Sequence, residues 1–276
     1  MKVDFLNRDL WKEFLTRMSI ISAILSIIFI FFSIPNDYKG WAGLIVILLF
    51  LGLYLWMWYG ANHLTEINLS IDGSKVSVLV GDLFEQSGSK VIAFNEYFDT
   101  QVDDIIITKN SLNGIYINKY FGRSVAELDQ IIDNNHFLDG ELIEKNVKRL
   151  GKSKKYKLGT ICKLDDYLLV AFSKFDSKNR AVLTMPEYLE FLINFWDSIN
   201  RVYARKSVSV PIFGSGITRI KEHKNISDEE LLKIMLWTFR ISEMRFKHPA
   251  KLNIVIHHDK IDSINLQSIK SMGNGF

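Results

Sequence analysis

The sequence predicts an α/β domain that follows a two-helix transmembrane hairpin. Two long runs before His63 carry no charge, strand-like and helix-like segments alternate through the second half, and an apolar strand there ends in Gly-Ser-Gly. Uncharged runs of this length are typical of membrane spans. The alternation is typical of a sheet with helices packed on its faces. We therefore expect a membrane segment over residues 1–63 and one globular domain over residues 64–276.

The overall composition narrows the classes of function. The chain has 276 residues, a formal net charge of +3 and a single cysteine, Cys162. Acidic and basic residues are interspersed, so no basic face indicates nucleic acid as a partner. A lone cysteine excludes an intramolecular disulfide and a cysteine-rich zinc site, and it fits a reducing compartment. No His, Asp and Glu residues show ligand spacing, so we expect no metal.

The two uncharged runs predict membrane helices over about residues 18–34 and 41–59. The turn PNDYKG joins them, and aromatic residues near the end of the second run suit the membrane interface. Residues 4–17 are typical of an amphipathic helix. A signal peptide is the competing interpretation of the first run. The long, partly acidic region before it and the lack of a small-residue cleavage site argue against that interpretation.

The charges flanking the spans predict their orientation. Four basic residues precede the first span, whereas the connecting turn offers only Lys39. The positive-inside bias therefore places the N-terminus in the cytoplasm, and two spans return the globular domain to the same side. We expect a multi-pass membrane protein.

The globular part begins with short strands. INLSI and KVSVLVGDLF predict two strands around the turn at Asp72 and Gly73, KVIAF a buried strand ending at Asn95, and DIIIT a further strand. The stretch SLNGIYINKYFGR is rich in turn formers. A helix should follow Ser124 as its N-cap, and LDGELIEKNVKRL is interpreted as another helix.

The second half of the domain alternates more regularly. Two strands lie within residues 156–176, and a long helix follows with Thr184 as its cap and Pro186 in its first turn. VSVPIF is a strand, the helix after it is capped by Ser227, and KLNIVIHH is the last strand. This order predicts the α/β sheet.

The loop after VSVPIF is the first candidate binding site. Ligands of open α/β sheets bind beyond the carboxyl ends of the strands. Gly214, Ser215 and Gly216 lie at such an end, where glycine lets the backbone direct its N–H groups at a phosphate. An ordinary turn is the alternative. No Gly-Lys-Ser/Thr follows, so this is not a Walker loop.

The order of these motifs resembles the macro domain, a three-layer α/β/α fold with a mixed sheet that binds ADP-ribose and related nucleotides. The resemblance implies that Asp82 in VGDLF lies near the adenine amino group and that Asn95 approaches the distal ribose. It matches SLNG, with Asn113 and Gly114, to the first glycine-rich loop. It matches Gly214, Ser215, Gly216 and Ile217 to the loop around the diphosphate. The chain departs from common macro domains in IAFNEYFDT, which lacks paired asparagines, and in the second loop, which lacks the triple glycine.

Two spans ahead of a divergent macro domain resemble the membrane type of the effectors of bacterial Thoeris antiphage defence. NEYFDT, SLNGIYINKYF and VPIFGSGITRI carry the likeness, together with the hairpin. The resemblance implies that a partner TIR-domain protein makes an ADP-ribose-derived signal, which the macro domain captures without a bound cofactor. The resemblance also implies that the chain lies in the bacterial inner membrane, where it would form homo-oligomers and disrupt the lipid bilayer.

Some roles stay open at this stage. Phe98 could stack on a ring of the ligand or belong to the core, and Asp99 could accept a ligand hydrogen bond or cap a turn. A membrane-bound ADP-ribosyl hydrolase is the alternative function, with Asp99, Asp103 or Asp104 as its general base. None of these has an obvious histidine partner, so we assign no catalytic residue. A passive membrane scaffold is the third possibility.

Overall fold

The chain forms two compact units in a computed structural model that describes residues 3–176, 180–216, 218–221, 223 and 225–273. The hairpin unit comprises the described residues up to Ile67 together with those from Ile264 onward, and the sheet unit comprises Asn68–Ser263. The sequence predicts one boundary near residue 63. It does not predict that the C-terminal helix α7 (Leu266–Gly273) belongs with the hairpin.

Two long helices, α1 (Arg8–Phe31) and α2 (Asn36–Asn62), form the hairpin. Residues 8–17 of the stretch predicted as an amphipathic helix form the first part of α1, which runs unbroken through Arg17. Asn7 sets its start by accepting hydrogen bonds from the backbone N–H groups of Asp9 and Leu10. The connection between the helices is not the predicted turn PNDYKG, since α2 begins directly after Pro35 and includes the rest of that stretch.

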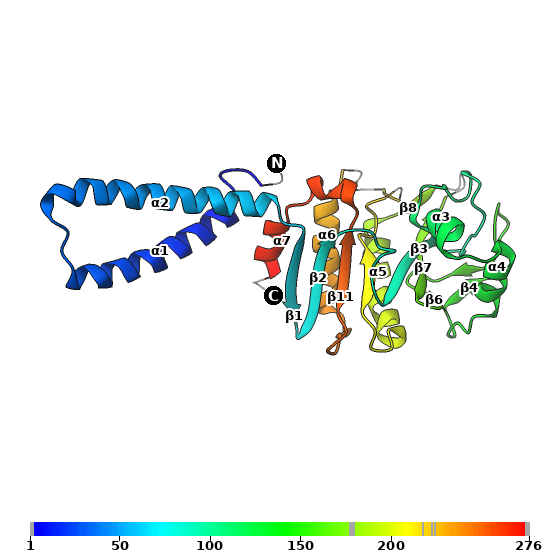
Figure 1. The fold of residues 1–276 in the computed structure, drawn as a ribbon. Coiled ribbons are helices and arrows are strands. Elements are labelled where there is room, and N and C mark those ends of the chain that lie inside the picture. The colour runs from blue at the N-terminus through cyan, green and yellow to red at the C-terminus, as the bar shows by residue number, and fades with distance from the viewer. Residues whose placement is uncertain (1–2, 177–179, 217, 222, 224, 274–276) are drawn as a thin grey trace. The chain divides into compact units, whose positions relative to one another are not determined.

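The two helices pack together at one end only. A cluster of buried side chains joins the start of α1 to the end of α2, formed by Val3, Leu10, Phe14, Tyr54, Met57 and Ala61. The chain before α1 crosses α2 there, because Trp58 Nε1 donates to the carbonyl of Val3 at 3.0 Å. From this end α1 and α2 diverge toward their connection (Figure 1), and their apolar side chains there are exposed.

In the sheet unit, nine strands of the described chain form one mixed sheet. Their order is β1-β2-β11-β9-β3-β7-β8-β10, with β6 paired to β7. The strands β2, β11, β9, β3 and β7 run parallel to one another, whereas β6 and β8 are antiparallel to β7. The bounds are β1 Glu66–Ile71, β2 Ser74–Val80, β3 Ser89–Asn95, β6 Ile161–Leu164, β7 Tyr167–Phe175, β8 Ala181–Leu183, β9 Val208–Pro211, β10 Arg219–Ile220 and β11 Leu252–Ile256.

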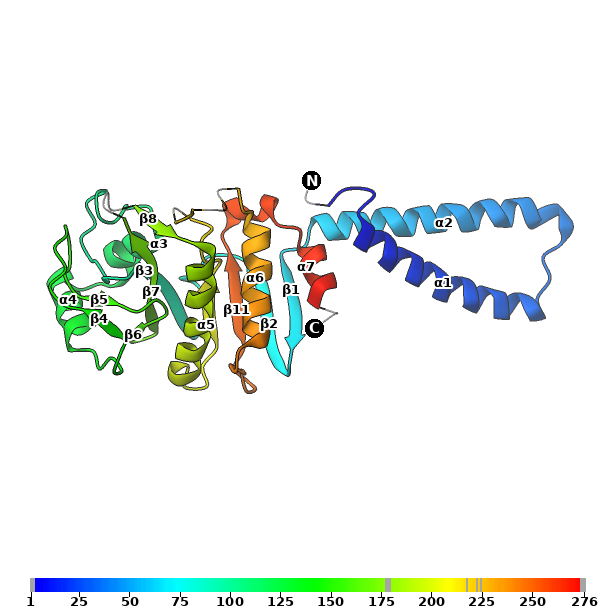
Figure 2. The ribbon, with the colours of Figure 1, turned by 180° about the vertical axis from the view of Figure 1, so that it is seen from behind.

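Helices cover both faces of this sheet near its centre. The helices α5 (Met185–Val202) and α6 (Asp228–Ile241) lie on one face (Figure 2). Alternate residues of β7 point to opposite faces. Phe172 packs on Phe191 of α5, whereas Ala171 joins the cluster on the other face with side chains of the π-helix η1 (Tyr116–Tyr120) and of α4 (Val125–Asn134). The predicted three-layer α/β/α fold with a mixed sheet is confirmed.

The predicted caps of the main helices are confirmed. Thr184 begins α5 and Ser227 begins α6, each through a capping box in which the glutamate three residues later bonds back to the cap. Ser124 likewise accepts from Glu127 at the start of α4. A 3-10 helix, η2 (His258–Ser263), follows β11.

Two elements that the sequence predicts are not formed. DIIIT forms no strand, because the carboxylate of Asp103 caps the N–H groups of Ile105 and Ile106 and that of Asp104 accepts from Lys109. LDGELIEKNVKRL forms no helix, since β4 (Leu142–Glu144) pairs with β5 (Lys155–Tyr156) and Asn146 adopts a positive φ of 63°.

Candidate functional site

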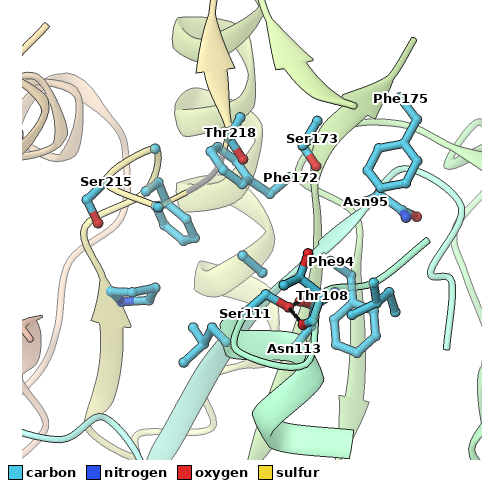
Figure 3. A pocket seen from close by; sticks show the side chains of 18 of the residues that line it. Phe94, Asn95, Thr108, Ser111, Asn113, Phe172, Ser173, Phe175, Ser215 and Thr218 are labelled. Carbon is cyan, nitrogen blue, oxygen red and sulfur yellow. Dashed lines mark hydrogen bonds between the residues drawn. The ribbon is translucent and has the colours of Figure 1, made fainter. Parts of the chain in front are cut away.

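The carboxyl ends of three parallel strands surround a cavity of about 240 Å³ in the sheet unit. The strands β3, β7 and β9 end at this edge, and the loops that follow β3 and β9 close the sides of the cavity. Figure 3 shows Asn95, Ser111, Asn113 and Ser215 around it. This is the place at which open α/β sheets bind their ligands.

The glycine loop after β9 lines the cavity and carries backbone N–H groups that have no acceptor among the described residues. Gly214 has a φ of 88°, which a residue with a side chain rarely adopts, and the N–H of Ser215 donates to the Ile212 carbonyl at 3.3 Å. Among the hydrogen bonds between described residues, none uses the N–H of Gly214 or Gly216 as donor. Two backbone N–H groups in one short loop form the kind of concave donor set that suits an anion.

A buried tyrosine supports this loop from behind. Tyr188 of α5 is 0% exposed, and its hydroxyl donates to the carbonyl of Phe213 at 2.9 Å. Burial raises the pKa of Tyr188, so the phenol keeps its proton and stays a donor. This hydrogen bond therefore ties the start of the glycine loop to the long helix α5.

The stretch SLNG forms the opposite wall and begins a short helix, α3 (Leu112–Ile115), where a glycine-rich loop is predicted. Ser111 is its N-cap, and the Ser111 hydroxyl also donates to Asn113 Oδ1 at 2.7 Å. Asn113 lines the cavity. Gly114 does not, but a Cβ there would lie 2.3 Å from the Thr108 carbonyl oxygen, so glycine allows the loop to close under the cavity wall.

Asn95 lies at the cavity, but its side-chain amide is already used inside the chain. Its Oδ1 accepts the N–H groups of Tyr97 and Asp99, and its Nδ2 donates to Asp99 Oδ2 at 2.9 Å. The β-bulge between Phe94 and Asn95 places Asn95 opposite Ser173 rather than Phe172. Asn95 thus shapes the end of β3 and fixes the loop that follows.

Two residues next to Asn95 lie away from the cavity. Asp99 is 1% exposed and forms an ion pair with Arg149, and its Oδ1 also accepts the N–H of Lys152 at 2.7 Å. Phe98 is 0% exposed and packs against Tyr156 and Phe137 in the core. Neither is part of the cavity lining. Contact of either with a ligand stays a prediction, as does the proposed adenine contact of Asp82.

Asp82 follows β2 at the same edge of the sheet, outside the cavity lining. Its carboxylate accepts the N–H of Phe84 at 2.8 Å, and its second oxygen has no hydrogen bond among the described residues. Ile217, the last residue predicted for the diphosphate loop, lies outside the described residues.

No described residue of the cavity lining titrates near neutral pH. The lining consists of apolar, amide and hydroxyl side chains and of glycine. The candidate bases Asp103 and Asp104 do not line it, and hydrogen bonds from backbone N–H groups lower the pKa of both carboxyls. Groups of three or more potential metal ligands are also absent from the described chain. The cavity can bind a polar ligand but offers no general base of its own.

The sequence did not indicate several lining residues. Phe172, Ser173 and Phe175 come from the carboxyl end of β7, and Thr108 and Asn110 from the loop after β3. The parallel pairing of β3 with β7 brings these residues to the site. The end of an apolar strand with a serine in it, as in VAFSKF, is the signal that could have found Ser173.

Comparisons with known proteins identify the family. A family model described as "Thoeris protein ThsA, Macro domain" matches residues 76–257. The chain is 44% identical over 236 residues to Thoeris protein ThsA of Bacillus amyloliquefaciens (strain Y2). The aligned region covers 82% of this chain and 78% of that protein.

Solved structures give weaker likenesses. A single-residue variant of an Oceanobacillus iheyensis macrodomain has a TM-score of 0.48 and 16% identity, over 78% of this chain and 96% of that one. The same macrodomain with ADP has a TM-score of 0.45 and 15% identity, over 78% and 100%. On the strength of the family model and the relative from Bacillus, this chain belongs to the ThsA family of Thoeris proteins and carries its macro domain.

Proposed function

We propose that this protein is a membrane-anchored antiphage effector whose macro domain binds an ADP-ribose-derived signal. The observation that carries the proposal is the cavity at the ends of β3, β7 and β9, with the Gly214 and Gly216 N–H groups on one wall. A diphosphate is an anion that two such backbone donors stabilise without a cationic side chain. The match to the macro domain of Thoeris protein ThsA supports the same class of ligand.

Binding without turnover fits this cavity best. Hydrolysis of an ADP-ribosyl bond needs a base that activates water, and the described lining holds no carboxylate or histidine. The candidate base Asp99 is buried in an ion pair, and both of its carboxylate oxygens accept hydrogen bonds. We therefore place this protein with sensors and not with hydrolases.

The hairpin unit supplies the proposed membrane anchor. Both helices are long and apolar enough to cross a bilayer. Only 6% of the most apolar 18-residue stretch of α1, and 11% of that of α2, is buried within the chain. A core helix of a soluble protein would be mostly buried, whereas these side chains require another apolar environment. We place both spans in the bacterial inner membrane, with the N-terminus and the macro domain in the cytoplasm.

The signal, on this proposal, is made by a TIR-domain partner of the Thoeris system and drives homo-oligomerisation and membrane disruption. Family membership supports the link to Thoeris. A ligand can drive assembly only if it binds the assembled form more tightly than the single chain. The helices α1 and α2 diverge and expose apolar side chains, so they are the part of the chain that such an assembly would rearrange in the bilayer.

Calorimetric titration of the full chain in detergent with ADP-ribose tests the binding step. We expect saturable binding with no product detected by chromatography after prolonged incubation. The variant Gly216→Val should abolish binding. Gly216 lines the cavity and no atom of the chain lies near the position of a Cβ there, so the valine side chain would fill space that the ligand needs. The control Ser153→Val adds the same branching to an exposed loop residue and should bind as the unmodified chain does.

Two results would contradict the proposal. Undiminished binding by Gly216→Val would remove the glycine loop from the site. Release of free ADP-ribose fragments by the unmodified chain, with loss of that activity in Asp99→Asn, would make the protein a hydrolase.

A further inference from the structure

A second cavity lies wholly within the hairpin unit, at the end where its helices pack. It measures about 240 Å³ and is bounded by α1, by the last turns of α2 and by α7. Its polar residues are Glu13, Arg17, Gln267 and Lys270, and Trp56 is among its apolar residues. The macro domain's ligand cavity shares none of these residues.

The charges in this cavity leave a cationic excess. Arg17 Nη2 pairs with Glu13 Oε1 at 2.6 Å, and Gln267 Nε2 donates to Glu13 Oε2 at 2.7 Å. The carboxylate of Glu13 is thus held on both oxygens. The Lys270 side chain is exposed and has no ion pair or hydrogen bond within the described chain. Two cations facing one carboxylate leave one positive charge, which matches a phosphodiester.

The depth of the cavity selects an amphiphilic anion. Arg17 is the last charged residue of α1, and the apolar run that follows reaches the end of the helix. Trp56 is 67% exposed beside it, and tryptophan favours the level of lipid head groups. A site with cations on one side and an exposed indole on the other suits a phosphate that carries acyl chains. A free phosphate ion would leave the indole in water.

We propose that an anionic phospholipid head group occupies this cavity. Its phosphate would accept hydrogen bonds from the Arg17 guanidinium and the Lys270 ammonium, and its glycerol would pack on Trp56. The lipid then bridges α7 to α1 and adds to the Gln267–Glu13 hydrogen bond that already joins them. Attachment of the C-terminal helix to the anchor thereby depends on lipid charge. The proposal rests on the membrane insertion of α1 and α2.

Native mass spectrometry of the full chain, released from nanodiscs with equal amounts of phosphatidylglycerol and phosphatidylcholine, tests it. We expect retained phosphatidylglycerol and little phosphatidylcholine. Lys270→Gln or Arg17→Gln should lower the retention about fivefold each. Glu13→Gln should raise it, because Arg17 loses its internal competitor. The matched control Lys12→Gln removes an exposed charge from the same helix outside the cavity and should change nothing.

Three outcomes would overturn the proposal. Equal loss in Lys12→Gln and Lys270→Gln would mean general attraction to a charged surface. Lower retention in Glu13→Gln would contradict the competition for Arg17. Displacement of the lipid by excess inorganic phosphate would make the cavity an ion site. Extraction of the unmodified chain by alkaline carbonate, measured alongside, would instead show that the spans do not insert, which is failure of the anchor itself.

Discussion

Arg149 and Asp99 form a buried ion pair outside the lining of the cavity, with Nη2 and Oδ2 2.9 Å apart. The side chains are 10% and 1% exposed. The Arg149 guanidinium also lies 3.9 Å from the centre of the Tyr97 ring, and Gly151 allows this approach because a Cβ there would contact Asp99 Oδ1 at 2.5 Å. Through Asp99 this pair holds Asn95, which lines the cavity. The segment around Arg149 therefore supports the site from outside.

Removing the charge of Arg149 should destabilise the sheet unit strongly. Arg149→Gln leaves the Asp99 carboxylate buried without its counter-charge, which costs about 3–5 kcal/mol. Urea denaturation followed by tryptophan fluorescence measures the change. Arg123→Gln breaks an exposed pair with Asp165 and should cost less than about 1 kcal/mol. Equal losses in the two variants would show that the buried pair has no special role.

Gly114→Ala should disturb the cavity without touching a ligand. The new Cβ would lie 2.3 Å from the Thr108 carbonyl oxygen and 3.0 Å from that of Lys109, so the loop has to move. We expect a loss of about 1–3 kcal/mol in stability, as for other overpacked sites, and weaker ADP-ribose binding because Thr108 lines the cavity. Gly216→Ala, where a Cβ meets open space, is the stability control. If Gly114→Ala and the unmodified chain had the same melting temperature, Gly114 would not lie close to the Thr108 carbonyl oxygen as described.

Glu96 should make the stability of the sheet unit depend on pH. The side chain is 2% exposed, and burial raises its pKa above the ordinary value of 4.5 despite Lys155 Nζ at 3.6 Å. The folded chain then holds this proton more tightly than the unfolded chain. The contribution of Glu96 to the free energy of unfolding therefore falls as pH rises from 4.5 through the raised pKa.

The neutral variant Glu96→Gln checks this dependence. Melting temperatures of the variant and the unmodified chain should be similar at about pH 4, and the variant should melt higher at about pH 7.5. A difference that is the same at both pH values would mean that the carboxyl does not titrate in this range. A variant that is less stable at neutral pH would mean that the ion pair with Lys155 outweighs burial.

Asp82 gives a test of the predicted adenine contact. Asp82→Asn keeps the oxygen that accepts the Phe84 N–H but removes the charge. If the carboxylate accepts the adenine amino group, the loss of a charged hydrogen bond should weaken ADP-ribose binding about tenfold, with ribose 5-phosphate unaffected. Calorimetry with both ligands separates these effects. Unchanged affinity for ADP-ribose would place adenine elsewhere.

The sequence predicted the parts of the fold that depend on local chemistry. Thr184 and Ser227 begin helices because each has a glutamate three residues later, and the turn at Asp72 and Gly73 has the positive φ values that these residue types accept. The glycine loop at Gly214 was found because strand, glycine and helix follow one another in the chain. These features need no knowledge of distant residues.

Features that depend on distant residues were missed. Asp103 and Asp104 turn the apolar stretch DIIIT into a capped loop, and periodicity does not record such side-chain bonds. The partner of Asp99 is Arg149, 50 positions away and in a segment interpreted as a helix. Helix α7 gains its place through contacts such as Gln267 with Glu13, near the other end of the chain. The residues of β7 at the cavity likewise became apparent only from strand pairing.

Amide hydrogen exchange of the full chain with and without ADP-ribose tests the central claim most directly. With ligand at about 100 times its Kd, exchange at Gly214 and Gly216 should slow by up to about 100-fold, while β1 exchanges as before. Protection of the loop would agree with a diphosphate bound by those N–H groups. Binding that leaves both amides exchanging at their original rates would contradict it.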